Sequence, residues 1–296
     1  MNLLKNRTTR RWFGLGPAVA TIFFFMVIPI GIIVVYSFLE ANPYGGVKPN
    51  LSFEAYIQFL FERDFDDSVI FNNAYLIICW RSFYLAALTT IFCLLIGFPT
   101  AYYMAMQPPS RRNVLVFLVT IPFWTNLLIR TFCWILILRD NGLVNNFLMG
   151  AGLIENPITL LYTNGAILLG LAYTYIPFMV LPIYSTVEKL DISLLEAAHD
   201  LYSNRRQLFR WVILPLAAPG IIAGSLLVFV PSLGAFIAPD LLGGGKKLML
   251  GKLIQLQFAS SRNWPFGSAI ALILMSVVLI AMMIYALGPA RKTNMH

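Results

Sequence analysis

Six long stretches of this 296-residue chain are almost free of charged residues. Each is between 26 and 32 residues long, and together they contain a single charged side chain, Arg130. A helix needs about 20 mostly apolar residues to cross a membrane, so each stretch suffices for one span and is too short for two. The stretches are 12–39, 82–110, 113–138, 156–187, 211–239 and 263–290. The pattern predicts an all-α membrane protein with six transmembrane helices.

The composition excludes several other classes of protein. The chain is 59% hydrophobic and 11% charged, whereas soluble domains carry roughly 25% charged residues. A soluble enzyme, a disordered chain and a disulfide scaffold are therefore excluded. Because no repeat or low-complexity run is visible, we expect a single transmembrane domain over residues 1–296. The expected spans are about 12–39, 82–106, 113–138, 163–187, 214–239 and 263–288.

The distribution of Lys and Arg predicts the orientation in the membrane. With the N-terminus in the cytoplasm, the inner segments hold twelve basic and four acidic residues, and the outer segments hold eight and nine. Basic residues favour the cytoplasmic side, and the first span usually dominates. The formal net charge of +8 thus reflects topology rather than a nucleic-acid partner. We expect both termini to be cytoplasmic, and 12–39, at 28 residues, to be an anchor because it exceeds the core of a signal peptide.

A connecting segment and the prolines of the spans add further predictions about the structure. Residues 139–155 are expected to contain a short amphipathic helix on the outer surface, built on Leu143, Phe147 and Leu148. Seven prolines lie within five spans, and helix breaks in lipid are tolerated where other groups bind the freed carbonyls. Single prolines are common in membrane helices, but this number favours a transporter with bent helices around a path.

The longest inner connection, 188–213, is the most polar part of the chain. Ser193 with Glu196 three residues later predicts a capping box at the start of a short helix. Leu208, Trp211 and Val212 predict a second short helix, which Pro215 leads into the fifth span. On local grounds this loop either lies on the membrane surface or fits a cleft on a cytoplasmic partner.

The same loop resembles the EAA loop of binding-protein-dependent ABC importer permeases. Glu196-Ala197-Ala198, a turn, and Val212-x-Leu214-Pro215 match its spacing, its side of the membrane and its place between spans four and five. Tyr202 stands where the family has glycine, and a left-handed turn strains a tyrosine, so we expect Asn204 to take that conformation. The resemblance implies a MetI-like ABC importer permease fold. It also implies that the loop couples this chain to an ATPase through Glu196, Ala197, Ala198, Asp200, Tyr202, Leu214 and Pro215.

The resemblance is strongest to the polyamine (spermidine/putrescine) subgroup and covers nearly the whole chain. It is carried by residues 121–126 with Arg130, and by 141–146, 177–184, 219–224, 240–244 and 263–267. It implies a multi-pass protein of the bacterial inner membrane that works with a second homologous permease, two ATP-binding subunits and a periplasmic polyamine-binding protein. ATP and Mg²⁺ would then belong to the partner ATPase, with no cofactor on this chain.

A polyamine path should offer hydrogen-bond acceptors and aromatic faces, because cation–π contacts guide a cation without trapping it. The candidates flank Pro122 and Pro177, with Asp240 as an acid near the outer end of span five. They are Phe123, Trp124, Thr125, Asn126, Tyr173, Tyr175 and Phe178. For each aromatic taken singly, contact with lipid or the core is the alternative.

Arg130 is the one intramembrane charge of the six windows, and such charges are functional by default. It is expected to snorkel outward or to form a structural or gating ion pair with Asp240. On this hypothesis Arg130→Glu cripples transport and Asp240→Arg restores it.

Three alternatives remain: the same importer class with another small solute, a self-sufficient secondary transporter, and an intramembrane enzyme. The last two are disfavoured because the windows hold no Asp, Glu or His, leaving no groups for ion coupling or catalysis. The chain also lacks a G-x-x-x-x-G-K-[ST] phosphate-binding loop, so ATP hydrolysis must be supplied by a partner. We expect neither catalytic residues nor a metal site.

Overall fold

The computed structural model describes residues 7–63 and 69–287, and it divides the chain into two compact units. One unit combines Met1–Tyr75 with Leu253–His296, and the other is Leu76–Lys252. The first contains α1 (Arg7–Ile22), the π-helix η1 (Phe23–Val27), α2 (Ile28–Ser37), β1 (Leu39–Ala41), β2 (Val47–Leu51), α3 (Glu54–Ile57), β3 (Phe61–Arg63), β4 (Val69–Phe71) and α14 (Trp264–Leu287).

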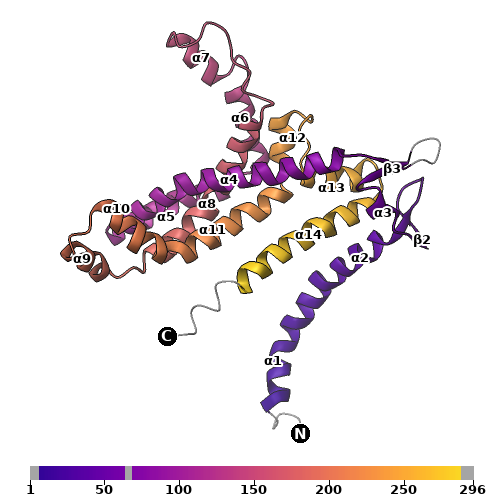
Figure 1. The fold of residues 1–296 in the computed structure, drawn as a ribbon, viewed down its shortest axis with the longest axis horizontal. Coiled ribbons are helices and arrows are strands. Elements are labelled where there is room, and N and C mark those ends of the chain that lie inside the picture. The colour runs from indigo at the N-terminus through magenta and orange to yellow at the C-terminus, as the bar shows by residue number, and fades with distance from the viewer. Residues whose placement is uncertain (1–6, 64–68, 288–296) are drawn as a thin grey trace. The chain divides into compact units, whose positions relative to one another are not determined.

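The second unit is helical throughout its described elements (Figure 1). It contains α5 (Pro109–Trp124), α6 (Leu127–Leu138), α7 (Leu143–Gly150), α8 (Asn164–Val187), α9 (Ile192–Asp200), α10 (Arg205–Leu208), the π-helix η2 (Phe209–Ile213), α11 (Leu214–Gly234) and α12 (Ile237–Gly243). Two helices cross the boundary between the units, namely α4 (Ala74–Ala105) and α13 (Leu250–Ala259).

In the first unit, α2 packs along α14, and the rings of Tyr36 and Trp264 stack with centroids 6.0 Å apart. The strands β1 and β2 pair antiparallel and are joined by a turn in which Gly45 and Gly46 have φ of 99° and 89°. Glycine adopts such φ values without strain. The two glycines therefore allow the tight turn between the strands.

In the second unit, α8 and α11 lie side by side, and α8 contributes more residues to the buried core than any other helix, followed by α4 (Figure 1). Small residues let the two backbones approach, since a Cβ on Gly220 would meet the carbonyl oxygen of Pro182 at 2.7 Å. Close approach at small residues is how membrane helices gain packing energy, because lipid supplies little hydrophobic drive. The helices α9 and α10 lie at one end of this pair, and α12 lies at the other (Figure 1).

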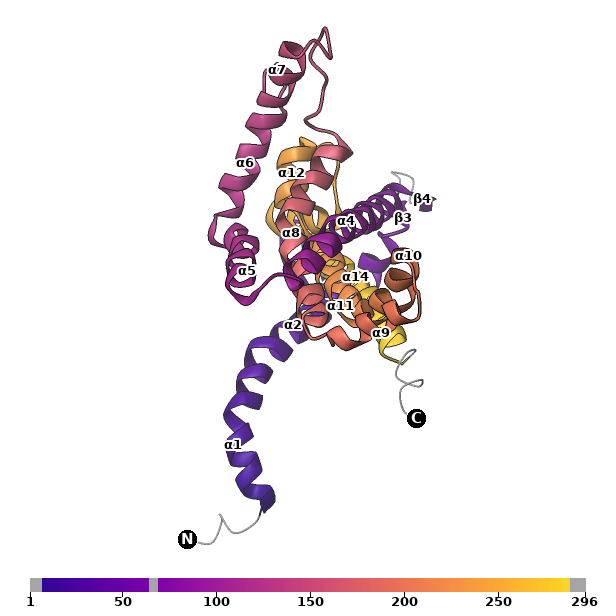
Figure 2. The same ribbon diagram turned by 90° about the vertical axis from the view of Figure 1, so that its left-hand side faces the viewer.

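The predicted spans agree with the helices except at the third and at the end of the fifth, because α11 ends at Gly234 rather than at residue 239. Within the described residues, five helices are long and apolar enough to cross a membrane, and a sixth span arises only if Pro109–Trp124 and Leu127–Gly150 count as one. These two segments are bent by 91°, so 113–138 is not one continuous helix. Figure 2 shows α7 at the far end of α6, away from the α8–α11 pair, whereas α6 itself contacts α8 and α12.

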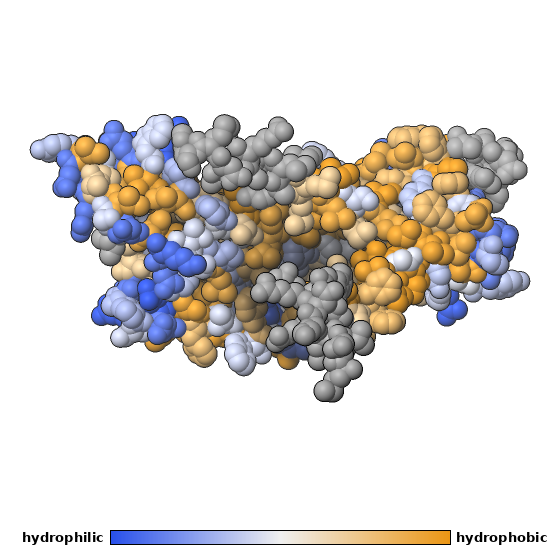
Figure 3. Space-filling model, turned by 90° about the horizontal axis from the view of Figure 1, so that it is seen from below, coloured by the Kyte–Doolittle hydropathy of each residue, from blue (hydrophilic) through white to orange (hydrophobic). Residues whose placement is uncertain are grey.

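Large apolar side chains cover much of the surface. Phe25 is 82% exposed and Trp124 is 81% exposed, and hydrophobic residues dominate the face seen in Figure 3. Soluble monomers rarely expose apolar patches of this extent. The surface is that of a protein surrounded by lipid.

Candidate functional site

The break between α5 and α6 is the most irregular backbone within the apolar stretches. Pro122 lacks the N–H needed for a helix hydrogen bond, and α5 ends two residues later at Trp124. Thr125 and Asn126 are extended, and the Asn126 side chain accepts a hydrogen bond of 2.8 Å from the Leu128 N–H, capping α6. The Asn126 cap stabilises the start of α6, so the interruption between the two helices is a stable part of the fold.

Arg130 supplies the donors for the carbonyl groups freed at this break. Its Nη2 donates to the carbonyl oxygen of Pro122 and, at 3.0 Å, to that of Thr125. Asp240 instead accepts a hydrogen bond from Lys252 at 2.9 Å. The ion pair predicted between Arg130 and Asp240 is therefore wrong in this structure. Arg130 binds nearby backbone carbonyl groups, and Asp240 is paired with Lys252.

Three of the predicted aromatics form a connected group beside the break. The ring centroids of Phe123 and Phe178 are 4.9 Å apart, and those of Tyr175 and Phe178 are 6.3 Å apart. The Tyr175 hydroxyl donates to the Pro231 carbonyl oxygen at 3.2 Å. Tyr173 lies on the same helix and faces the Arg130 guanidinium. The structure therefore gathers Phe123, Tyr173 and Tyr175 with Thr125 and Asn126 in one region, while Trp124 points outward and is largely exposed.

A cavity of about 160 Å³ opens within the second unit next to this group. Ligand pockets usually measure about 300–1,000 Å³, so this cavity is too small to enclose a substrate by itself. It is lined by Leu127, Leu171, Thr174, Tyr175, Pro231, Gly234, Ala235, Phe236, Ile237 and Ala238.

The lining residues Pro231 and 234–238 were not predicted from the sequence as part of a site. They lie where α11 ends and the chain turns into α12, inside a stretch expected to be one continuous helix. The available signal was Pro231 with Gly234 three residues later, since both weaken a helix interior.

The inner loop contains the two short helices predicted from its sequence, but the first begins differently. Asp191, not Ser193, provides the cap of α9, because its Oδ1 accepts the Ser193 N–H at 2.9 Å. This bond and one from the Ser193 side chain hold the pKa of Asp191 below its ordinary value. The predicted Ser193–Glu196 capping box is therefore wrong, and Glu196 is left exposed on α9.

The turn between the two short helices places Tyr202 in the left-handed region, with φ of 56°. Its side chain is 95% exposed. Asn204 is instead extended and forms a capping box with Gln207 at the start of α10. The expectation that Asn204 would take the left-handed conformation is wrong, because its side chain is needed as the cap.

The other coupling residues expected in this loop also lie at the surface. Glu196, Ala197 and Asp200 are exposed, and Ala198 is half-buried. The second short helix continues through η2 into α11, where Leu214 is the first residue and Pro215 the second. The loop therefore continues into α11 without an interruption of the helix, and its acidic side chains are exposed.

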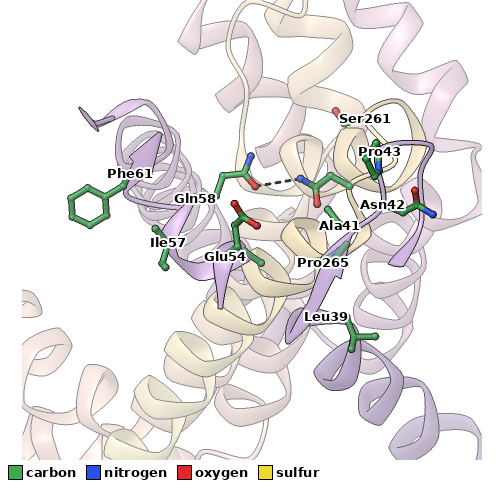
Figure 4. A pocket seen from close by; sticks show the side chains of 12 residues that line it. Leu39, Ala41, Asn42, Pro43, Glu54, Ile57, Gln58, Phe61, Ser261 and Pro265 are labelled. Atoms are coloured by element: carbon green, nitrogen blue, oxygen red, sulfur yellow. Dashed lines mark hydrogen bonds between the residues drawn. The ribbon is translucent and has the colours of Figure 1, made fainter. Parts of the chain in front are cut away.

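A larger cavity of about 570 Å³ lies in the first unit, on the segments expected to face outward (Figure 4). The Asn263 side chain donates to Gln58 Oε1 at 3.3 Å across it, and Glu54 reaches toward the same point from α3 (Figure 4). None of the predicted path residues lines this cavity. No group of three or more His, Cys, Asp or Glu that could hold a metal occurs in the described residues.

Comparison with known proteins agrees with the arrangement of spans and inner loop. Residues 94–292 match the family described as "Binding-protein-dependent transport system inner membrane component". This chain belongs to that family. The match covers the inner loop and every residue singled out around the break, so the chain is a multi-pass inner-membrane permease of a binding-protein-dependent ABC transporter, a transport subunit rather than an ATPase.

This permease is similar over most of its length to individual relatives and to a solved structure. It is 43% identical over 269 residues to the spermidine/putrescine transport system permease protein PotB of Haemophilus influenzae, covering 91% of this chain and 90% of the relative. It is 39% identical over 261 residues to PotB of Escherichia coli K12, covering 88% and 91%. A bacterial ABC transporter that imports the acidic polysaccharide alginate has the same fold, with TM-score 0.72, 15% identity, and coverage of 97% and 99%.

Proposed function

We propose that this permease carries polyamines, spermidine and putrescine, from the periplasm to the cytoplasm. The observation that carries the proposal is the 43% identity, over 91% of the chain, to a spermidine/putrescine permease. The proposed partners are a second homologous permease, two ATP-binding subunits and a periplasmic polyamine-binding protein. ATP and Mg²⁺ act on the ATP-binding subunits.

The chemistry around the break supports a cationic substrate. Phe123, Tyr173 and Tyr175 offer aromatic faces, and the Thr125–Asn126 segment offers polar groups, with no free cation among them. The one nearby cation, Arg130, is engaged by two carbonyl oxygens and lies over the Tyr173 ring. Aromatic faces attract an ammonium group without the strong binding of a carboxylate, which suits a path that must release its cargo.

We propose that the inner loop is the contact with the ATPase. Glu196 and Asp200 present an acidic face, Tyr202 presents an exposed ring, and the loop continues into α11, which lines the small cavity. Exposed aromatic residues are favoured as anchors at protein interfaces.

Uptake of labelled putrescine and spermidine into vesicles, with and without the cognate binding protein, tests the substrate. Uptake that requires both the binding protein and ATP is the expected result. Transport in the absence of any ATPase, or of a different solute only, would contradict it.

Co-purification tests the coupling loop. Glu196→Lys should abolish recovery of the ATPase with the permease, because it reverses the charge of the exposed face. Glu155→Lys is the matched control, since Glu155 is exposed in the connection between α7 and α8, away from the loop. Equal recovery from the two variants would count against the assignment.

A further inference from the structure

Arg112 and Glu188 form an ion pair at the inner end of the second unit. Arg112 Nη1 lies 3.1 Å from Glu188 Oε1, and the side chains are 25% and 31% exposed. A partly buried pair holds its geometry better than a solvated surface pair.

The pair is not explained by the stability of the helices that carry it. Arg112 lies in the first turn of α5, and Glu188 is the C-terminal cap of α8. Helix N-termini favour anions and C-termini favour cations, so each charge occupies the unfavourable end of its own helix. What offsets this cost is the contact between α5 and α8.

Glu188 also lies at the entrance to the coupling loop. The helix α9 begins at Ile192, four residues after Glu188. Leu190 and Leu195 on either side of this start pack against the same buried cluster as α8. The start of α9 and the end of α8 therefore share one packed cluster, next to the carboxylate that binds Arg112.

The other end of α5 reaches the break beside the substrate path. The helix has 16 residues, about 24 Å at 1.5 Å per residue, and it contacts α8 again through Phe123 and Phe178. Beyond it, the carbonyl groups of Pro122 and Thr125 bind Arg130 of α6. One helix thus joins the ion pair to the break.

We propose that Arg112 and Glu188 are a positioning pair that couples the inner loop to the break between α5 and α6. The proposal rests on the proposed function, in which that loop binds the ATPase and the break borders the path. Movement of the loop pulls on α5 through the pair and shifts the carbonyl groups held by Arg130. Without the pair, ATP hydrolysis continues but moves the break less.

The test uses the complete transporter, reconstituted in proteoliposomes with its binding protein, and measures polyamine imported per ATP hydrolysed. The double variant Arg112→Gln/Glu188→Gln removes the pair and leaves no unpaired charge. We expect it to retain the ATPase on co-purification, to hydrolyse ATP, and to import at least threefold less polyamine per ATP. The charge exchange Arg112→Glu/Glu188→Arg should keep the wild-type ratio, and it should fold well because both charges then suit their helix ends.

A matched control distinguishes coupling from a general effect of losing an ion pair. Lys48 and Glu40 form a pair of similar length, 3.0 Å, in the first unit, and Lys48→Gln/Glu40→Gln should leave the ratio unchanged. An unchanged ratio in the Arg112/Glu188 neutral variant would overturn the proposal, as would a parallel loss of uptake and hydrolysis or failure of the charge exchange to restore the ratio. Failure of the wild-type complex to import polyamines would instead contradict the proposed function itself.

Discussion

The guanidinium carbon of Arg130 lies 5.5 Å from the centre of the Tyr173 ring. The same guanidinium donates hydrogen bonds to the carbonyl oxygens of Pro122 and Thr125. Arg130 therefore joins three elements: the end of α5, the start of α6 and the face of α8. A charge in an apolar stretch is costly unless it is bound, and here backbone dipoles and a ring bind it.

Arg130→Gln is expected to abolish polyamine uptake and to lower stability by about 2 kcal/mol, the usual worth of hydrogen bonds to a charged group. Uptake in vesicles and thermal unfolding of the purified permease measure the two effects. Arg139→Gln is the control, because Arg139 is exposed and contributes only its backbone to the end of α6.

The structure also predicts that Asp240→Arg does not rescue Arg130→Glu. Asp240 is bound to Lys252, so a new arginine at position 240 meets a cation rather than the new acid. Restored uptake in the double variant would show that the two residues meet in another state of the transporter.

The spans were predictable from sequence because lipid leaves few choices: a long uncharged stretch must form a helix. The break inside 113–138 was not, because Pro122 also fits a continuous kinked helix, and only the side chains of Asn126 and Arg130 make the interruption stable. Family resemblance located the inner loop, but local capping decided its turns. Ser193 and Asp191 are both good caps, and spacing alone does not show which one binds the free N–H.

The ion pair between Arg112 and Glu188 was harder to predict from the sequence than the spans were. Both are charged residues next to the ends of apolar stretches on the predicted inner side. Their contact depends on how α5 packs on α8, which the sequence pattern does not specify. The same holds for the small cavity, whose lining residues come from four helices and the turns between them.

Two substitutions of Tyr202 separate the energetic cost of its left-handed backbone conformation from the contribution of its ring to binding the ATPase. A non-glycine residue in the left-handed region costs about 1 kcal/mol or more, so Tyr202→Gly should be about 1 kcal/mol more stable than Tyr202→Ala in thermal unfolding. Both variants lose the exposed ring, and both should bind the ATPase more weakly than wild type by the same factor. Undiminished binding by both would show that the ring is not an anchor.

Asp191 is expected to hold the start of α9 throughout the pH range in which transporters are assayed. Its pKa lies below the ordinary value because the Ser193 N–H and side chain bind the carboxylate. A lowered pKa means that its contribution is fully present above the ordinary value and is lost only as the pH falls through the lowered one.

Hydrogen exchange of the α9 amides should therefore show the same protection at neutral pH and at about pH 5. Asp191→Ala should exchange faster at both pH values, while Asp191→Asn, which keeps an acceptor, should resemble wild type. Loss of protection in the wild-type chain between these pH values would contradict the capping role.

The close approach of α8 and α11 predicts different costs for two glycines on α11. A Cβ on Gly220 would lie 2.7 Å from the Pro182 carbonyl oxygen, which is backbone and must move as part of α8. A Cβ on Gly224 would meet Met179 Sδ at 2.9 Å, the end of a flexible side chain, with the Met179 carbonyl oxygen at 3.1 Å. Overpacking of a tight contact costs about 1–3 kcal/mol, so Gly220→Ala should lower thermal stability more than Gly224→Ala. Gly234→Ala on the same helix is the control, since its Cβ would meet nothing within 4 Å, and equal shifts for all three would mean that helix propensity rather than packing sets the cost.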